Sequence, residues 1–129
     1  MSARPAKITS LDGCEVRVVD AERVTATRER LPSEAELPGL TGLFRLLGDA
    51  TRVRLLYALL EAGELCVCDL AAAIDASETR VSHSLRLLRT AGVVRARRDG
   101  RQMFYRLDDS HVRMLLDLSR EHLRHRQEG

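Results

Sequence analysis

The sequence lacks the features of a membrane or secreted protein. It has no tryptophan, and aromatic residues make up only 3% of its 129 residues, so aliphatic side chains have to build the core. Its longest apolar run is far shorter than the roughly 20 residues that a membrane-spanning helix needs. Residues 1–16 contain no continuous apolar stretch of the kind found in secretory signals. We therefore expect a cytoplasmic protein with no membrane contact.

The charged residues nearly balance, and one basic type is almost missing. The chain has 21 basic and 19 acidic residues and a net charge of +2, and all of its basic residues except Lys7 are arginines. Arginine favours bidentate contacts to phosphate and guanine. Because the net charge is small, only the distribution of the arginines along the chain can indicate a nucleic-acid partner.

Cysteine is scarce, and its number is odd: Cys14, Cys66 and Cys68. In a chain that we expect to be cytoplasmic, three thiols argue against a disulfide framework and for metal binding or redox chemistry. The alternative is a buried, inert cysteine that packs like a small hydrophobic residue.

Hydrophobic periodicity divides the chain into an N-terminal arm, residues 1–32, and a domain, residues 33–126. In the arm we expect one short helix over about 18–31, ended by Pro32. In the domain, helices are predicted over about 40–47 and 51–62. The first ends at Gly48, the second begins at a cap, Asp49 or Thr51, and Gly63 ends it.

Two further helices, about 66–74 and 77–91, flank a tight turn at Asp75-Ala76. Ser77 is the predicted N-cap of the second helix, and the short turn is typical of a helix-turn-helix. Next, Asp99-Gly100 lies between two β-prone runs, which predicts a hairpin. A long terminal helix follows. The expected fold is mostly α with a small β-hairpin, a winged helix-turn-helix.

The second helix and the hairpin carry the residues suited to DNA. Val81, Leu85 and Leu88 form the buried stripe of the helix, and its other face offers hydroxyls and arginines to a major groove, with Ser84 expected among the exposed residues. A solvated amphipathic helix beside a soluble hairpin is the alternative, but adjacent cations on both elements favour DNA binding. The predicted DNA contacts are Ser77, Thr79, Arg80, Ser82, His83, Arg86, Arg97, Arg98 and Arg101.

The terminal helix carries Asp109, His111, His122 and His125. His111 and His122 share a face, since eleven residues turn the helix to within roughly 20° of alignment, but they stand about 16 Å apart. One zinc ion with bonds of about 2.0–2.1 Å cannot reach both in one chain. An antiparallel partner helix would set Asp109 and His111 beside the other chain's His122 and His125. This set suits Zn(II) best, with Co(II) or Ni(II) as further candidates; surface histidines on a polar tail are the alternative.

Cys66 and Cys68 would lie 200° apart on a regular helix, so both face one ion only if Cys66 stands at the helix start. Two thiolates make half a site. Cys14 could complete it from the arm, and Asp12 or Asp69 could supply an oxygen. Soft thiolates select Cd(II), Pb(II) or Zn(II) over hard ions. A purely structural thiol pair is the alternative.

Five segments together resemble the ArsR/SmtB family of bacterial metal-sensing repressors: LGDATRVRLLYAL, ELCVCDLA, SETRVSHSLRLLRTAGVV, RRDGRQMFYRL and DDSH. The resemblance covers about residues 40–125. It implies a homodimeric winged helix that binds operator DNA without metal and releases it when metal binds. It also implies that His83 lies where some members link the metal helix to the reading helix.

The resemblance also bears on the two candidate metal sites. The family's interhelical zinc sensors have Asp-x-His followed by two further ligands at the spacing seen at Asp109, His111, His122 and His125. ELCVCDL resembles the thiolate sensors of Cd(II), Pb(II) or arsenite. Two departures stand out: Ala71 occupies the place of a third arsenite-binding cysteine, and the arm has only Cys14 where the cadmium and lead sensors have two.

The sequence thus predicts a repressor that binds operator DNA in the metal-free form and is released by Zn(II). Two alternatives stay open: a thiol-based sensor of arsenite, Cd(II) or Pb(II) at Cys66 and Cys68, and a redox-sensing repressor. An enzyme is not expected, because neither a nucleophile–base pair nor a phosphate-binding glycine loop is present.

Overall fold

The computed structural model describes the backbone of residues 7–11 and 14–128 and the side chains of residues 19–128. The chain divides into two compact units, residues 1–38 and 39–129. In neither is a described helix both long and apolar enough to cross a bilayer.

The first unit contains a β-hairpin and one helix. Strands β1 (Lys7–Leu11) and β2 (Cys14–Val18) pair antiparallel. Helix α1 (Ala21–Arg30) begins at Asp20, whose carboxylate accepts a hydrogen bond of 3.1 Å from the Arg23 amide. The expected helix is therefore present, but its predicted start at residue 18 is wrong, because that residue still belongs to β2.

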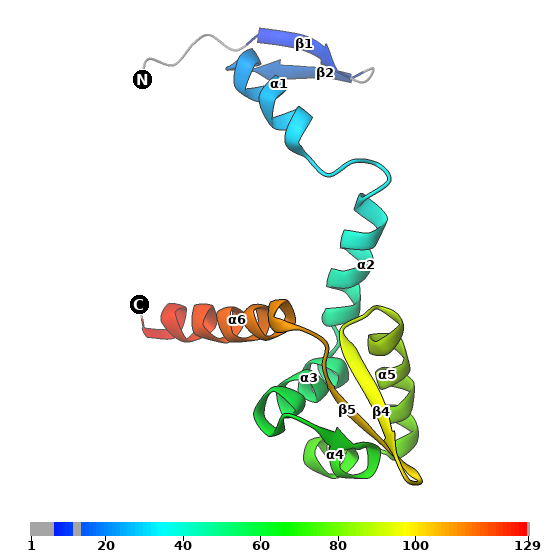
Figure 1. Ribbon diagram of the computed structural model, residues 1–129. Coiled ribbons are helices and arrows are strands. Elements are labelled where there is room, and N and C mark those ends of the chain that lie inside the picture. Colours follow the sequence, from blue (N-terminus) through cyan, green and yellow to red (C-terminus); the bar gives the residue numbers. More distant parts are fainter. Residues whose placement is uncertain (1–6, 12–13, 129) are drawn as a thin grey trace. The chain divides into compact units, whose positions relative to one another are not determined.

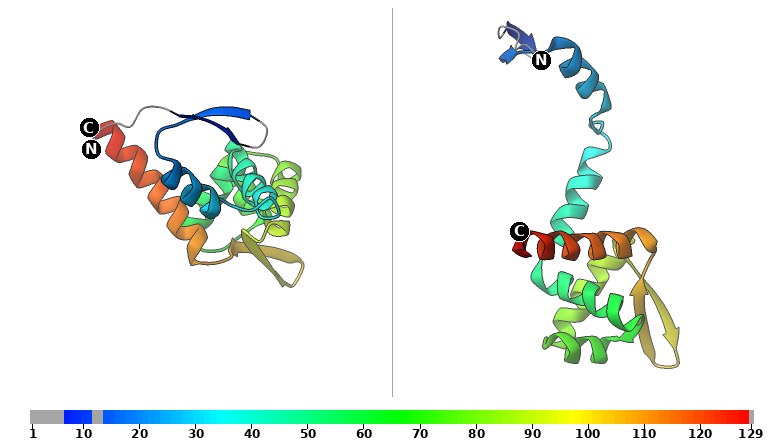
Figure 2. Two further views of the ribbon diagram at one scale, coloured as in Figure 1. Left: turned by 90° about the horizontal axis from the view of Figure 1, so that it is seen from above. Right: turned by 90° about the vertical axis from the view of Figure 1, so that its left-hand side faces the viewer.

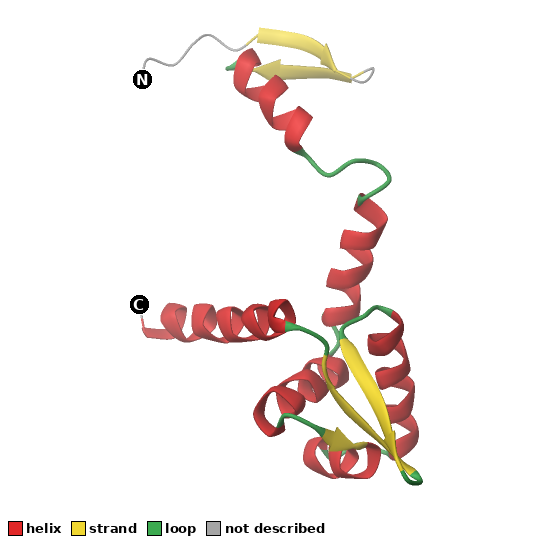
Figure 3. Cartoon of the chain, in the orientation of Figure 1, coloured by secondary structure: helices red, strands yellow, loops and turns green. Residues whose placement is uncertain are grey.

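The second unit contains the helix-turn-helix (Figure 1, Figure 3). Helix α2 spans Leu37–Leu47, at the border of the units, and helix α3 spans Ala50–Ala62. Helices α4 (Val67–Ile74) and α5 (Glu78–Thr90) form the helix-turn-helix.

The caps confirm where α3 and α5 begin and where α3 ends, whereas α2 begins three residues before its predicted start at about 40. Asp49 accepts from the Arg52 amide at 3.0 Å, and Ser77 accepts from the Arg80 amide at 3.1 Å. Gly63 ends α3 with φ of 87°, which glycine adopts without strain. Asp75 makes the turn after α4 in the left-handed conformation, which aspartate tolerates better than most residues.

The core is aliphatic, as the lack of aromatics requires. Leu70 of α4 packs against α3 and α5, and the predicted stripe of Val81, Leu85 and Leu88 is fully buried. Ser84 is also buried, so its expected exposure is wrong. It lies three residues after Val81 and one before Leu85, which places it at the edge of the buried stripe.

A three-stranded antiparallel sheet lies beside these helices in the order β3-β5-β4. Strand β3 (Leu65–Cys66) is short, and the hairpin of β4 (Val94–Asp99) and β5 (Gln102–Leu107) is the wing (Figure 2). The pair Asp99↔Gln102 closes the hairpin. The turn is thus residues 100–101, one position later than Asp99-Gly100, with the glycine at φ of 65°.

Helix α6 (Ser110–Glu128) is attached to the core near its start. Leu116 is buried, and its carbonyl accepts a hydrogen bond of 2.7 Å from the Tyr57 hydroxyl of α3. One turn on, the Arg120 guanidinium lies 5.4 Å from the centroid of the Tyr57 ring, and the side chains of the C-terminal half of α6 are exposed. The end of the helix extends away from the core (Figure 1).

Candidate metal centre and nucleic-acid interface

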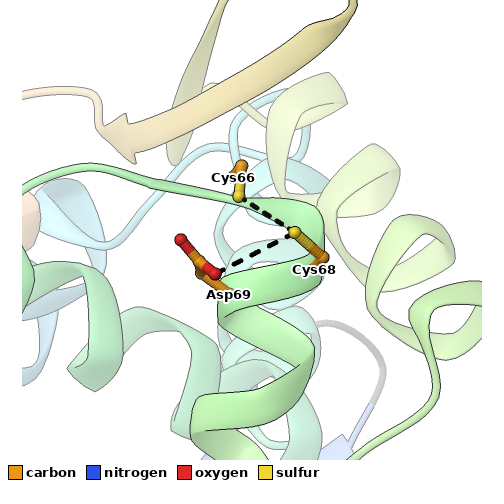
Figure 4. Close-up of side chains that lie close together, drawn as sticks. All are labelled: Cys66, Cys68 and Asp69. Atoms are coloured by element: carbon orange, nitrogen blue, oxygen red, sulfur yellow. Dashed lines mark hydrogen bonds between the residues drawn. The ribbon is translucent and has the colours of Figure 1, made fainter.

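Two cysteines meet at the start of α4 (Figure 4). Cys66 is the N-cap residue, with extended backbone at φ −80° and ψ 170°, and Cys68 lies in the first turn. Because Cys66 stands outside the helical spiral, the 200° separation of a regular helix does not apply, and the two Sγ atoms lie 3.3 Å apart. The geometric condition for a shared ion, that Cys66 stands at the helix start, is met.

Asp69 adds an oxygen to this pair. Its Oδ1 lies 3.9 Å from Sγ of Cys68, and one donor atom from each of the three residues falls within 4.8 Å of the others. We call these three residues the thiolate cluster. Cys66 is buried, whereas Cys68 and Asp69 are exposed, so the cluster is open to solvent on one side. The side chain of Cys14 lies outside the described residues.

The donor set fits a thiophilic metal ion. Bonds of about 2.3 Å in tetrahedral geometry place two sulfurs about 3.8 Å apart, so the sulfurs would have to separate by about half an ångström. The hydrogen bond with Cys66 raises the pKa of the Cys68 thiol, and partial burial adds to this. A metal ion would therefore have to displace protons to bind here.

The second candidate site begins at the N-terminus of α6. Asp109 caps this helix: its Oδ1 accepts from the amides of His111 at 2.9 Å and Val112 at 3.2 Å. Its Oδ2 lies 3.5 Å from Nδ1 of His111. The hydrogen bond from the Val112 amide, followed by the contact with His111, lowers the pKa of the Asp109 carboxyl. Asp109 is thus an anion that lies beside the His111 imidazole while it caps the helix.

His122 and His125 are exposed farther along α6 and do not join Asp109 and His111 within the chain. At 100° per residue, the three histidines lie within about 40° of Leu118 on one face of the helix. Met114 and Leu118 on that face are 56% and 59% exposed. One face of α6 therefore carries histidines at its two ends and unpartnered apolar side chains between them.

The predicted DNA contacts on α5 lie on its outer face. Their side chains are exposed, opposite the stripe that packs into the core. These residues are Ser77, Thr79, Arg80, Ser82, His83 and Arg86.

The three arginines predicted as DNA contacts of the wing differ in their surroundings. Arg98, near the end of β4, and Arg101, in the turn, are exposed. The Arg97 side chain is also exposed, at 52%, but its guanidinium donates to the Glu64 carboxylate at 2.6–2.9 Å and lies 4.9 Å from the centroid of the Phe104 ring. These hydrogen bonds lower the pKa of Glu64 and raise that of Arg97. No sequence signal indicates this pair, because 33 positions separate its members and β3 is not predicted.

A helix-turn-helix that leads into an antiparallel hairpin, with polar and basic side chains outward on both, defines a winged-helix DNA-binding protein. Residues 49–96 match the profile of the arsR family of bacterial regulatory proteins. The chain belongs to this family, as the sequence resemblance indicated. The family consists of transcriptional regulators, which confirms that the protein is not an enzyme.

Relatives and a solved structure agree with this assignment. The chain is 37% identical over 113 residues to a cadmium resistance transcriptional regulatory protein CadC homolog of Staphylococcus aureus, covering 88% of this chain and 93% of that protein. It is 42% identical over 116 residues to a transcriptional repressor SmtB homolog of Synechocystis sp., covering 90% and 85%. The crystal structure of the AntR antimony-specific transcriptional repressor superposes with a TM-score of 0.68 at 36% identity, covering 77% and 89%.

Proposed function

We propose that the protein is a homodimeric repressor that binds operator DNA in its metal-free form and releases it when a thiophilic metal ion binds. The observation that carries this proposal is the thiolate cluster, which stands at the start of the first helix of a winged helix-turn-helix. Relatives named for cadmium resistance and antimony specificity support a soft ion as effector. Cd(II) and Pb(II) are the ions that we expect at Cys66 and Cys68, with Cys14 as third thiolate.

The unpartnered apolar face of α6 supports the dimer. Met114 and Leu118 are 56% and 59% exposed, and Phe44 of α2 is 67% exposed. A cavity of about 370 Å³ lies between α2, α3 and α6 and is lined by Phe44, Leu115 and Leu123 among others. Exposed apolar surface on this scale marks an interaction site, and a second copy would cover it isologously.

A second effector site at α6 is favoured by the contact between Asp109 and His111. In our proposal the partner protomer supplies His122 and His125, and Zn(II) is held by one oxygen and three imidazole nitrogens across the dimer. The histidines border the same apolar face that the dimer would bury. Metal binding there would favour one interprotomer geometry and thereby change how two reading helices fit successive major grooves.

The test is an operator-binding titration by fluorescence anisotropy with Cd(II) and Zn(II), combined with metal stoichiometry per dimer. We expect either effector to lower operator affinity by about 5–150-fold. Unchanged affinity with both ions would contradict the proposal. Direct DNA contacts in this proposal come from the outer face of α5 and from Arg98 and Arg101.

Variants assign the response to one site. If Cys66→Ser loses the Cd(II) response and His122→Gln keeps it, the Cd(II) response belongs to the thiolate cluster. If His122→Gln loses the Zn(II) response and Cys66→Ser keeps it, the Zn(II) response belongs to the site on α6. A redox sensor would instead release DNA on metal-free peroxide treatment, with a matching loss of free thiols.

A further inference from the structure

One side-chain clasp joins the wing to the segment that carries the cysteines. The Glu64 carboxylate accepts two hydrogen bonds of 2.9 Å from Nε of Arg97 and one of 2.6 Å from Nη2. The same guanidinium lies over the ring of Phe104. We call these three residues the clasp. A carboxylate that engages both Nε and Nη2 fixes the orientation of the arginine as well as its position.

The clasp follows the register of the sheet. Cys66 of β3 is the Cα partner of Phe104 in β5, and Phe104 is the Cα partner of Arg97 in β4. Glu64 directly precedes β3. A line of paired backbone therefore runs from Cys66 to Arg97, and the Glu64 side chain closes it back to the start of β3.

We infer that the clasp couples the thiolate cluster to the wing, and that Arg97 is a positioning residue for the wing rather than a DNA ligand. This inference rests on the proposed function. Cys66 belongs to β3 and is only 5% exposed, so an ion bound to its sulfur is attached directly to a buried residue of that strand. Glu64 lies two residues away, and Arg97 is fixed to it.

Apart from the clasp, few contacts join β3 to the wing. It pairs with β5 through only two residue pairs, Leu65↔Tyr105 and Cys66↔Phe104, whereas β4 and β5 share six. The side-chain link from Glu64 goes directly to β4, the strand that carries Arg98 and leads into the turn that contains Arg101. A soft cation at the cluster would thus alter the placement of the two arginines that we propose contact DNA.

The test uses the full-length protein with Cd(II) as probe. Glu64→Gln removes the charge, and Arg97→Lys keeps the charge but loses the two-pronged geometry, so the clasp is weakened from either side. Asp99→Asn is the matched control. Asp99 also faces Arg97, at 3.8 Å from Nη1, and its replacement by asparagine removes the same charge with a side chain of nearly the same size outside the turn residues 100–101.

Three measurements are needed. Cadmium–thiolate charge-transfer absorbance reports metal binding at sulfur, amide hydrogen exchange of residues 94–107 reports the wing, and anisotropy reports operator affinity. In the wild type and Asp99→Asn, we expect Cd(II) to change wing exchange and to lower operator affinity by about 5–150-fold. In Glu64→Gln and Arg97→Lys, we expect unchanged cadmium absorbance, no change in wing exchange and less than about threefold loss of operator affinity, where threefold is under 1 kcal/mol.

The outcomes separate this inference from the proposed function. Wing exchange that still responds to Cd(II) in both clasp variants, or a response that disappears equally in Asp99→Asn, overturns the inference. The inference also fails if the wild-type wing does not respond while operator affinity falls. If the wing responds only with the clasp intact but operator affinity never changes, the inference stands and the proposed function is wrong.

Discussion

Oδ2 of Asp109 lies 3.5 Å from Nδ1 of His111, while Oδ1 of the same carboxylate caps α6. One residue thus combines a structural role with a proposed metal-binding role, and the two can be separated. Asparagine caps a helix about as well as aspartate does but offers no anionic oxygen to a metal ion.

We therefore predict that Asp109→Asn lowers Zn(II) affinity by at least about tenfold, since even outer-shell changes at zinc sites cost 10–100-fold. The midpoint of thermal unfolding should change little. Calorimetric titration with Zn(II) measures the affinity. Asp108→Asn is the matched control, because Asp108 is paired with Arg95 and is not a proposed ligand. Wild-type zinc affinity in Asp109→Asn would remove this residue from the site.

Cys14 is the proposed third thiolate, and charge-transfer absorbance tests it. If three sulfurs bind Cd(II), Cys14→Ser should lower the absorbance per bound ion by about one third, because the band scales with the number of sulfur ligands. Cys68→Ser should abolish tight binding, since it removes half of the pair at α4. Undiminished absorbance in Cys14→Ser would show that the arm does not contribute a ligand.

The helix boundaries can be predicted because they are local. Asp49 and Ser77 each cap the helix that follows within three residues, so no distant contact is needed to recognise them. Cys66 lies one residue before α4, although the predicted helix began at about 66, and its side chain makes no cap hydrogen bond that a local pattern could reveal. The N-terminal hairpin is not among the predicted elements although β2 alternates apolar and charged residues in CEVRV, because a single short alternation inside a polar arm is a weak signal.

The parts of the site that could not be predicted depend on tertiary register. Strand β3 has two residues, too few for a period to be visible, and only its pairing with β5 defines it. Without β3, the sequence cannot show that Glu64 reaches Arg97. The expected exposure of Ser84 is wrong because it follows from the hydroxyl alone, whereas the position of this residue on the helix sets it beside the buried stripe.

The wing arginines should contribute to DNA affinity through phosphate charge. Arg101→Gln is expected to weaken operator and non-specific DNA binding to a similar extent. It should also reduce the slope of log affinity against log salt by about 0.9, the value expected when one phosphate is no longer neutralised. Anisotropy at several salt concentrations measures this. Arg113→Gln on α6 has the same change in charge and should leave the slope unchanged.

The apolar face of α6 should hold the dimer together. Leu118→Glu removes the free energy gained by burying one leucine side chain, about 1.5–3 kcal/mol. A twofold-symmetric dimer contains two such leucines, so the loss per dimer is doubled. We expect the dimer dissociation constant to rise by at least about a hundredfold in sedimentation equilibrium. Leu87→Glu, at an exposed leucine of α5, is the control. A dimer unaffected by Leu118→Glu would place the interface elsewhere.

Asp49 should make the stability of the domain depend on pH. The hydrogen bond from the Arg52 amide, followed by the charge of Arg52, lowers the pKa of the Asp49 carboxyl. A group whose pKa is lower in the folded state stabilises the fold above its unfolded pKa, and this contribution is lost as pH falls through the folded pKa.

At neutral pH we expect Asp49→Ala to lower the midpoint of thermal unfolding by about 4–8 °C, because the N-cap acceptor is lost. Asp49→Asn should lie close to the wild type, since the amide oxygen still accepts from Arg52. At pH values below the ordinary pKa of aspartate, the unfolding midpoint of the wild type should fall to that of Asp49→Ala. The midpoint of Asp49→Asn should stay above that of Asp49→Ala, because its side chain does not titrate. A wild-type advantage over Asp49→Ala that persists unchanged under strongly acidic conditions would show that the ionised carboxylate contributes nothing beyond its shape.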